Sequence, residues 1–153
     1  MLKLINNNLL YKKNIKFIFR THPLIDVLRD FKENIINKNI IFSKEKNIIN
    51  DFKKSDIILY NGSSVCIQAA MSGLVPVTFN NDVKHFSLDP LYKINKFIIK
   101  NPKTLLQMIN LIDKNKFTVK FKIKLKKVQK YCYLYFQKFD QKILTKSIIH
   151  NEK

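Results

Sequence analysis

Short apolar runs alternate with amphipathic stretches along most of this chain, and this alternation constrains its fold more than any other feature. Runs of Ile, Val, Leu and Phe predict short strands, and the stretches between them carry apolar residues at helical spacing. Strands that alternate with helices in this way predict parallel βαβ units. We therefore expect an α/β fold: a Rossmann-like, doubly wound parallel sheet with a C-terminal helical extension.

The expected elements follow one another closely. Strands are predicted at residues 15–20, 39–42, 56–60, 74–79 and 97–100. Helices are predicted at 2–12, 23–35, 43–52, 65–72 and 101–112. Residues 80–93 have no clear period and predict a loop.

The last quarter of the chain carries two competing periods. Apolar residues alternate with lysine from Phe117 to Leu125, which is typical of a strand, whereas Val128, Cys132 and the aromatic residues after them have helical spacing. We favour a long helix from about residue 121 to 139. This divides the chain into an α/β domain at 1–115 and a basic helical extension at 116–153 that packs on it.

The charge balance is strongly basic. There are 29 Lys and Arg against 11 Asp and Glu, for a net charge of +18, yet Lys, Ile and Asn alone make up 66 of the 153 residues. An AT-rich coding sequence produces this bias. Only Arg20 and Arg29 are arginines, the residue that base and phosphate recognition favours. We interpret the charge as compositional and do not expect nucleic acid as a partner, although it confers affinity for acidic partners.

Cysteine usage and the N-terminal residues bear on localisation. Cys66 and Cys132 each lie in an apolar run without a CxxC motif, which is typical of buried thiols in a reducing compartment. The opening MLKLINNNLLYKK lacks the continuous apolar core of a signal peptide. We expect a cytoplasmic protein, with contact to the inner face of the cell membrane as an open alternative.

Two loops directly follow predicted strands, at the edge where open α/β sheets bind ligands. The first is Arg20-Thr21-His22-Pro23, in which Pro23 suits the first turn of a helix. His22 would lie beside a helix N-terminus, where anions are stabilised and an imidazole can donate to a phosphate. The alternative is a histidine that only satisfies backbone groups.

The second loop is Asn61-Gly62-Ser63-Ser64. Gly62 permits a tight turn, and the two serines offer hydroxyl and backbone N–H groups at the start of the next helix, a candidate phosphate cradle. Gln68 follows Ser64 by four residues, so it shares a helix face with Ser64 and could bind a ribose hydroxyl. The alternatives are a serine that simply caps the helix and an ordinary exposed glutamine.

The run RTHP, followed about forty residues later by DIILYNGSSVCIQAAMSGLVPVTF, resembles the C-terminal, donor-binding half of GT-B glycosyltransferases. The likeness is to bacterial surface-carbohydrate enzymes of the sialyltransferase, polysialyltransferase and CDP-glycerol glycerophosphotransferase kind. These families pair a His-Pro motif with a Ser-Ser or Ser-Thr motif. The resemblance covers roughly residues 15–112.

The resemblance implies a role for each motif residue. His22 would bind the donor phosphate and assist the leaving group, which makes it the expected catalytic residue. The donor-phosphate site would comprise Arg20, His22, Pro23, Gly62, Ser63 and Ser64, and Gln68 would bind the ribose. The donor would be a nucleotide-activated sugar or glycerol, CMP- or CDP-linked, and the acceptor a glycan of the cell envelope. Such enzymes generally need no metal, so neither a metal nor another cofactor is expected.

The sequence departs from this family in two places. Gln68 stands where many relatives have Glu, which weakens a bidentate ribose contact. In addition, a GT-B enzyme needs two Rossmann domains and takes its acidic catalytic base from the first, for which the residues before Arg20 are too few. We therefore expect half an enzyme, whose partner chain supplies the rest, or an inactive nucleotide-binding remnant; a basic nucleic-acid-binding protein is a third alternative.

Other candidate sites have less support. Asp82, His85 and Asp89 lie in the predicted loop at 80–93, where nothing defines a metal-ligand geometry, and His150 has no supporting context. GxSxG, GxGxxG and GxxxxGK[ST] motifs are absent. A basic stretch interleaved with Phe and Tyr contains Lys116, Lys120, Lys122, Lys124, Lys126, Lys127 and Lys130. We interpret it first as a solvated helix face, then as a surface for anionic lipid, and last as a nucleic-acid surface.

Overall fold

The computed structural model describes residues 15–21, 38–79, 89–94 and 97–136. The helices predicted at 2–12 and 23–35 lie outside these residues, as does most of the loop predicted at 80–93.

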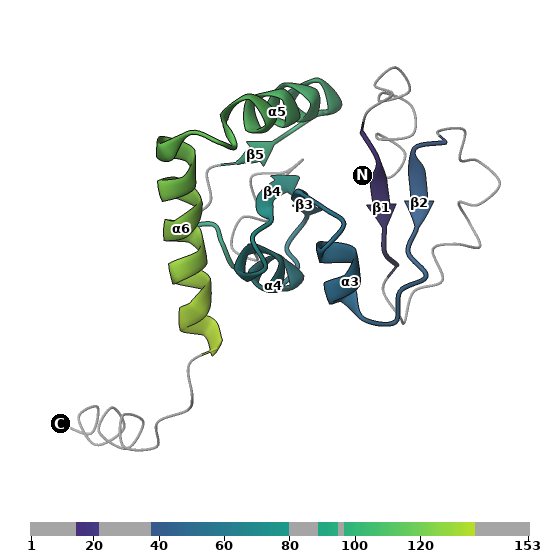
Figure 1. Ribbon diagram of the computed structural model, residues 1–153, viewed down its shortest axis with the longest axis horizontal. Helices are drawn as coiled ribbons and strands as arrows, with labels where there is room; N and C mark the ends of the chain where they lie inside the picture. The colour runs from purple at the N-terminus through teal and green to yellow at the C-terminus, as the bar shows by residue number, and fades with distance from the viewer. Residues whose placement is uncertain (1–14, 22–37, 80–88, 95–96, 137–153) are drawn as a thin grey trace.

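Parallel strands alternate with helices along the described chain, as the hydrophobic pattern predicts (Figure 1). The strands are β1 (Phe17–Phe19), β2 (Ile40–Phe42), β3 (Ile57–Tyr60), β4 (Val75–Phe79) and β5 (Ile98–Ile99). The helices are α3 (Ile48–Phe52), α4 (Val65–Met71), α5 (Pro102–Asn115) and α6 (Val119–Tyr133), and a 3-10 turn, η3 (Leu134–Phe136), follows α6. The protein is thus a mixed α/β fold with a C-terminal helix.

The described strands form two small sheets by hydrogen bonding, where the sequence predicts one open sheet. β1 pairs with β2, and β3, β4 and β5 form a second sheet in that order. Every pair is parallel, with Phe17 opposite Ile40 in the first sheet and Tyr60 opposite Thr78 in the second. The carboxyl ends of β3 and β4 therefore open onto the same edge.

Strand β4 is buried at every residue although it contains a proline, Pro76. Val75 N donates to Asp56 O on the β3 side, and Thr78 N donates to Phe97 O on the β5 side. Donors alternate between the two neighbours along a strand, so the nitrogen of Pro76, which carries no hydrogen, faces the β5 side. The ladder to β5 accordingly starts at Thr78.

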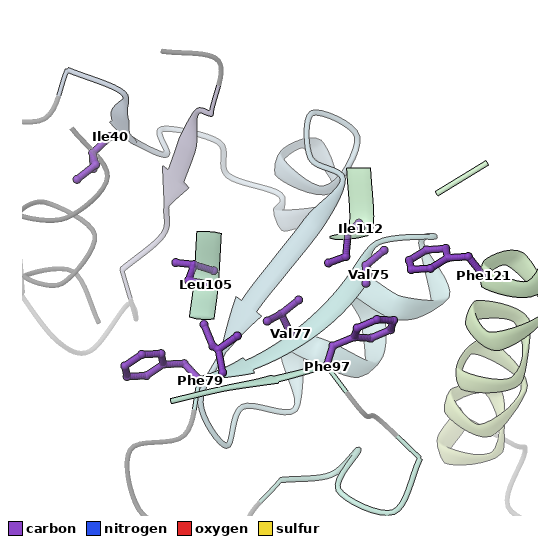
Figure 2. Close-up of a cluster of buried hydrophobic side chains, with 9 residues drawn as sticks. Ile40, Val75, Val77, Phe79, Phe97, Leu105, Ile112 and Phe121 are labelled. Atoms are coloured by element: carbon purple, nitrogen blue, oxygen red, sulfur yellow. The ribbon is translucent and has the colours of Figure 1, made fainter. Parts of the chain in front are cut away.

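One apolar core joins the two sheets to α5 and α6. Val75, Val77 and Phe79 alternate along β4 and present one face of the strand, as the period of two requires. Figure 2 shows these β4 side chains in the middle of a group that extends to α5, β5 and α6. Phe17, Phe19 and Phe42 of the first sheet pack against the same group.

A second core lies between α4 and α6. It contains Tyr60, Cys66, Ile67, Ala70, Leu91, Val128 and Cys132. Gln129 Nε2 on α6 also donates to Ala70 O at 3.2 Å, which ties the two helices together. α6 therefore lies along the edge of the molecule with one side packed against α4 (Figure 1).

Residues 119–133 are helical, so the helix interpretation of the basic stretch is confirmed over this range and the strand alternative is wrong. α6 begins two residues earlier than predicted because Thr118 caps it, accepting from Phe121 N. The α-helix ends at Tyr133 and becomes a 3-10 turn, short of the predicted end at 139. None of the described helices is long and apolar enough to cross a membrane.

Helix α3 begins at Ile48, and its predicted start at Ser43 is wrong. Asn47 is the true N-cap, since its side chain accepts from Ile49 N at 2.9 Å. The Ser43 hydroxyl instead lies 2.7 Å from Asp51 Oδ2 and accepts from Glu45 N. Ser43 therefore holds the loop before α3 against the helix.

Candidate functional site

The loop from Asn61 to Ser64 connects the carboxyl end of β3 to α4. Gly62 has a φ of 63°, in the left-handed region where a side chain is strained, so glycine suits this turn. Asn61, Gly62 and Ser64 are exposed and Ser63 is half-buried. The loop predicted to bind phosphate thus lies at the carboxyl edge of the parallel sheet, the edge at which open α/β sheets in general bind ligands.

Neither serine makes a strong cap on α4. Ser64 occupies the N-cap position, but its φ of −64° and ψ of −16° are helical, and its side chain makes no cap hydrogen bond. The Ser63 hydroxyl accepts from Val65 N at 3.4 Å, which is long for such a bond. A serine that simply caps the helix therefore does not account for Ser64.

Gln68 lies on the solvent-facing side of α4, one turn after Ser64. Both residues are exposed, whereas the helix buries Cys66, Ile67, Ala69 and Ala70. The shared face predicted from their spacing is present. Gln68 is also the exposed polar residue on a buried helix that the alternative interpretation describes, so its position fits both interpretations.

Arg20, the first residue after β1, is engaged by the protein itself. Its Nη1 lies 2.8 Å from Asp51 Oδ2, and its guanidinium also donates to the carbonyls of Glu45 and Lys46. His22 and Pro23 lie outside the described residues. The structure therefore brings Gly62, Ser63, Ser64 and Gln68 together, while Arg20 takes part in contacts around α3.

A buried polar network that the sequence did not predict lies at the same edge of the sheet. Tyr60 donates to Asp89 Oδ1 at 2.9 Å, and the Thr78 hydroxyl lies 2.7 Å from Tyr60 Oη and 2.9 Å from Asp89 Oδ2. Leu91 N donates to Asp89 Oδ1 as well. The carboxylate thus joins the ends of β3 and β4 to residues 89–94. Tyr60 and Thr78 are polar residues near the ends of predicted strands, which the sequence does show. Their meeting could be predicted only if the register between β3 and β4 were known.

Both cysteines are buried thiols of low reactivity. Burial raises the pKa of Cys66 to about 12, with the Asp89 carboxylate adding to the shift, while a hydrogen bond with Tyr60 opposes it. Burial raises the pKa of Cys132 to about 11. Since the thiolate is the nucleophile, neither residue is suited to nucleophilic catalysis near neutral pH.

A cavity of about 320 Å³ lies at the opposite edge of the second sheet. Asp56 and Val75, at the amino ends of β3 and β4, line it together with Gly73, Lys116 and Phe121. Ligands of open parallel sheets bind at the carboxyl edge, so this cavity is not where the predicted site would be.

The described residues contain no candidate metal-binding site. Over the ranges that the structure describes, no three His, Cys, Asp or Glu side chains gather closely enough to hold an ion. Asp82 and His85 lie outside those ranges. Asp89, the described member of that predicted loop, is bound by Tyr60 and Thr78.

Comparisons with protein family models, with curated proteins and with solved structures find no match. The resemblance to GT-B enzymes therefore rests on the short motifs at residues 20–23 and 56–79. Any ligand is inferred from those motifs and from the geometry of the Asn61–Ser64 loop.

Proposed function

We propose that this chain is the Rossmann-like donor-binding domain of a GT-B-type glycosyltransferase acting in surface-polysaccharide synthesis. Its donor would be a cytidine-nucleotide-activated sugar or glycerol. The observation that supports this proposal most is the exposed Ser64 hydroxyl, which is not used for capping and shares its helix face with Gln68. Ser64 would bind the donor phosphate and Gln68 the ribose.

The chemistry assigned to the site is stabilisation of a leaving phosphate. During transfer from a sugar donor, the bond between the sugar carbon and the donor phosphate oxygen breaks, an acceptor hydroxyl oxygen bonds to that carbon, and the hydroxyl proton passes to the acidic base expected from the partner chain. With a CDP-linked glycerol donor, the bond between the glycerol-bearing phosphorus and the bridging oxygen breaks instead, and the acceptor oxygen bonds to that phosphorus. Negative charge then develops on the nucleotide phosphate, where preorganised hydrogen-bond donors lower the barrier. His22, Ser63 and Ser64 would supply those donors. Arg20, already paired with Asp51, would hold the end of β1 in place so that the motif two residues later is positioned.

Calorimetric titration of the purified chain with CMP, CDP and UDP tests the proposal. We expect saturable binding of a cytidine nucleotide, lost in His22→Ala. Ser64→Ala should weaken it about tenfold, the value of one hydrogen bond to a charged group. Ser72→Ala is the matched control, because it removes an exposed serine hydroxyl at the other end of α4. Unchanged affinity in both His22→Ala and Ser64→Ala would show that the phosphate site is assigned wrongly.

A transfer assay separates an enzyme from a binding subunit. Sugar transfer by the chain alone would mean that it holds its own catalytic base. Binding without transfer would favour a nucleotide-binding subunit completed by a partner chain.

A further inference from the structure

One side of α6 is fully engaged with the rest of the protein. Phe121, Val128 and Cys132 are buried, and Lys124 Nζ lies 4.2 Å from the centroid of the Phe97 ring. These contacts set the rotation of the helix about its axis. The opposite side faces away from α4, at the edge of the molecule (Figure 1).

The outward side of α6 carries charge of one sign. Between Lys114 and Phe136 the chain has eight lysines and neither Asp nor Glu. On α6 itself the exposed ones are Lys120, Lys122, Lys126, Lys127 and Lys130. Among the described residues, the ion pairs involve other basic residues, namely Arg20, Lys54 and Lys116. A concentrated positive field therefore lies along this face.

Large apolar side chains are exposed on the same side of the helix. Val119, Ile123, Lys126, Lys130 and Tyr133 follow one another at intervals of four, three, four and three residues, and so form one stripe, which we call the outer stripe. Val119 is 73% exposed, Ile123 52% and Tyr133 56%. Phe117 precedes the stripe and Leu134 and Phe136 follow it, all more than half exposed. Apolar side chains of this size, exposed along one side of a helix and interleaved with lysine, are typical of a surface that binds a partner with both apolar and anionic groups.

We propose that the outer stripe of α6, with its flanking lysines, binds the surface of a bilayer that contains anionic lipid. The lysines would lie among the headgroup phosphates, and Val119, Ile123 and the apolar residues at either end would enter the boundary with the acyl chains. This surface does not depend on the nucleotide site, which lies in the loop between β3 and α4.

The apolar members favour a bilayer over a nucleic acid. Single-stranded nucleic acids are held by aromatic stacking and by lysine and arginine along the backbone, and α6 contains no arginine. Val119, Ile123 and Leu134 cannot stack on bases and would stay in water on a phosphodiester backbone. At a lipid surface, each of these side chains would bury apolar area among the acyl chains and so remove it from water.

Vesicle co-sedimentation of the full chain measures the lysine contribution. We expect binding to vesicles of phosphatidylcholine mixed with phosphatidylglycerol, little binding to phosphatidylcholine alone, and weakening by salt. Lys126→Gln with Lys130→Gln should lower the partition coefficient about thirtyfold, since each lysine near the surface contributes about fivefold. The matched control is Lys44→Gln with Lys46→Gln, exposed lysines before α3 that carry the same charge. Because charges beyond a Debye length are screened, the control should change the coefficient less than about threefold.

Fluorescence tests insertion separately. The chain has no tryptophan, so Ile123→Trp introduces a single emitter into the outer stripe. Its emission should shift to the blue on anionic vesicles and be quenched by brominated acyl chains. Ile41→Trp is the control: Ile41 is 48% exposed, against 52% for Ile123, and lies on β2. Its emission should not change.

Three results would overturn the proposal. The first is no binding to anionic vesicles. The second is an equal loss of vesicle binding in the two double-lysine variants, together with unchanged emission of Ile123→Trp on vesicles. That result would mean that net charge attracts the protein to the vesicles without a specific binding face. The third is displacement from vesicles by duplex DNA or RNA through the same lysines at physiological salt, which would assign the face to nucleic acid.

Discussion

The guanidinium of Arg20, just past β1, lies 2.8 Å from the carboxylate of Asp51 in α3. Asp51 is 7% exposed and also binds the Ser43 hydroxyl, while Arg20 donates to two carbonyls of the loop before α3. One cluster thus joins the first sheet to the helix that leads into the second.

Removal of the arginine should therefore be costly. Arg20→Ala leaves a buried carboxylate without its cation, which we expect to lower the free energy of unfolding by about 2 kcal/mol, reduced from the fully buried case because Arg20 is part-exposed. Urea denaturation measures the loss. Lys46→Ala, which removes an exposed cation from the same loop, is the control and should change stability by less than about 0.5 kcal/mol. Equal effects would mean that the ion pair contributes nothing specific.

Gly62 and Gly73 both have positive φ, 63° and 95°. An alanine at either position should cost about 1–2 kcal/mol of stability through backbone strain. At Gly73 the strain acts alone, since an added Cβ meets no atom within 4 Å. Gly62→Asn should cost less than Gly62→Ala, because asparagine tolerates this region better. Thermal unfolding of the three variants ranks them, and a neutral Gly62→Ala would contradict the turn geometry.

The buried carboxylate of Asp89 accepts hydrogen bonds from side chains on two strands and from Leu91 N. Asp89→Ala should destabilise the protein by about 3 kcal/mol, because it removes the buried acceptor of three hydrogen bonds. Tyr60→Phe should cost about 1 kcal/mol. If the network acts as a unit, the double variant will lose less than the sum of the single losses. Tyr133→Phe, which removes an exposed hydroxyl, should be neutral.

Helix α5 begins with a reciprocal cap. The Asn101 side chain accepts from Thr104 N, and the Thr104 hydroxyl accepts from Asn101 N. Asn101→Ala should lower stability by about 1 kcal/mol. Gln107→Ala, at an exposed position inside the same helix, should leave stability unchanged or raise it slightly. Chemical denaturation distinguishes the two, and equal effects would argue against the cap.

The buried thiols predict a loss of stability at alkaline pH. Burial raises the pKa of Cys66 to about 12 and of Cys132 to about 11, so the folded chain holds these protons more tightly than the unfolded chain. The contribution is fully present below the unfolded thiol pKa of about 8.5 and is lost as the pH rises through the folded values. The melting temperature should therefore fall between about pH 8.5 and about 12, and fall less steeply in the Cys66→Ala, Cys132→Ala double variant. Parallel curves for the two proteins would contradict this account.

Local pattern was enough to predict most of the described elements. The strands at 56–60 and 74–79 and the helix starting at Asn101 follow from apolar runs, glycine and capping residues close by in the sequence. Ser43 misled the prediction of α3 because its hydroxyl binds Asp51, eight residues on, and a competing cap at Asn47 was available. The division of the strands into two sheets depends on pairing, which periodicity does not encode.

In the candidate site, too, only the features that depend on local spacing could be predicted from the sequence. The shared face of Ser64 and Gln68 follows from a spacing of four. The engagement of Arg20 by Asp51, 31 residues away, and the meeting of Tyr60, Thr78 and Asp89 depend on tertiary contacts, so neither could be derived from local sequence.

Pro76 governs more than its own strand. Because its nitrogen carries no hydrogen, Pro76 gives β4 no donor toward β5 before Thr78, and a shift of β5 toward the start of β4 would add no bond donated by that residue. The missing donor favours the observed pairing, in which Thr78 lies opposite Ile98. Since Asn101 and α5 follow β5 directly, and α6 follows α5, a single imino acid in the middle of the sheet helps determine where the lysine-bearing helix comes to rest on the outside of the molecule.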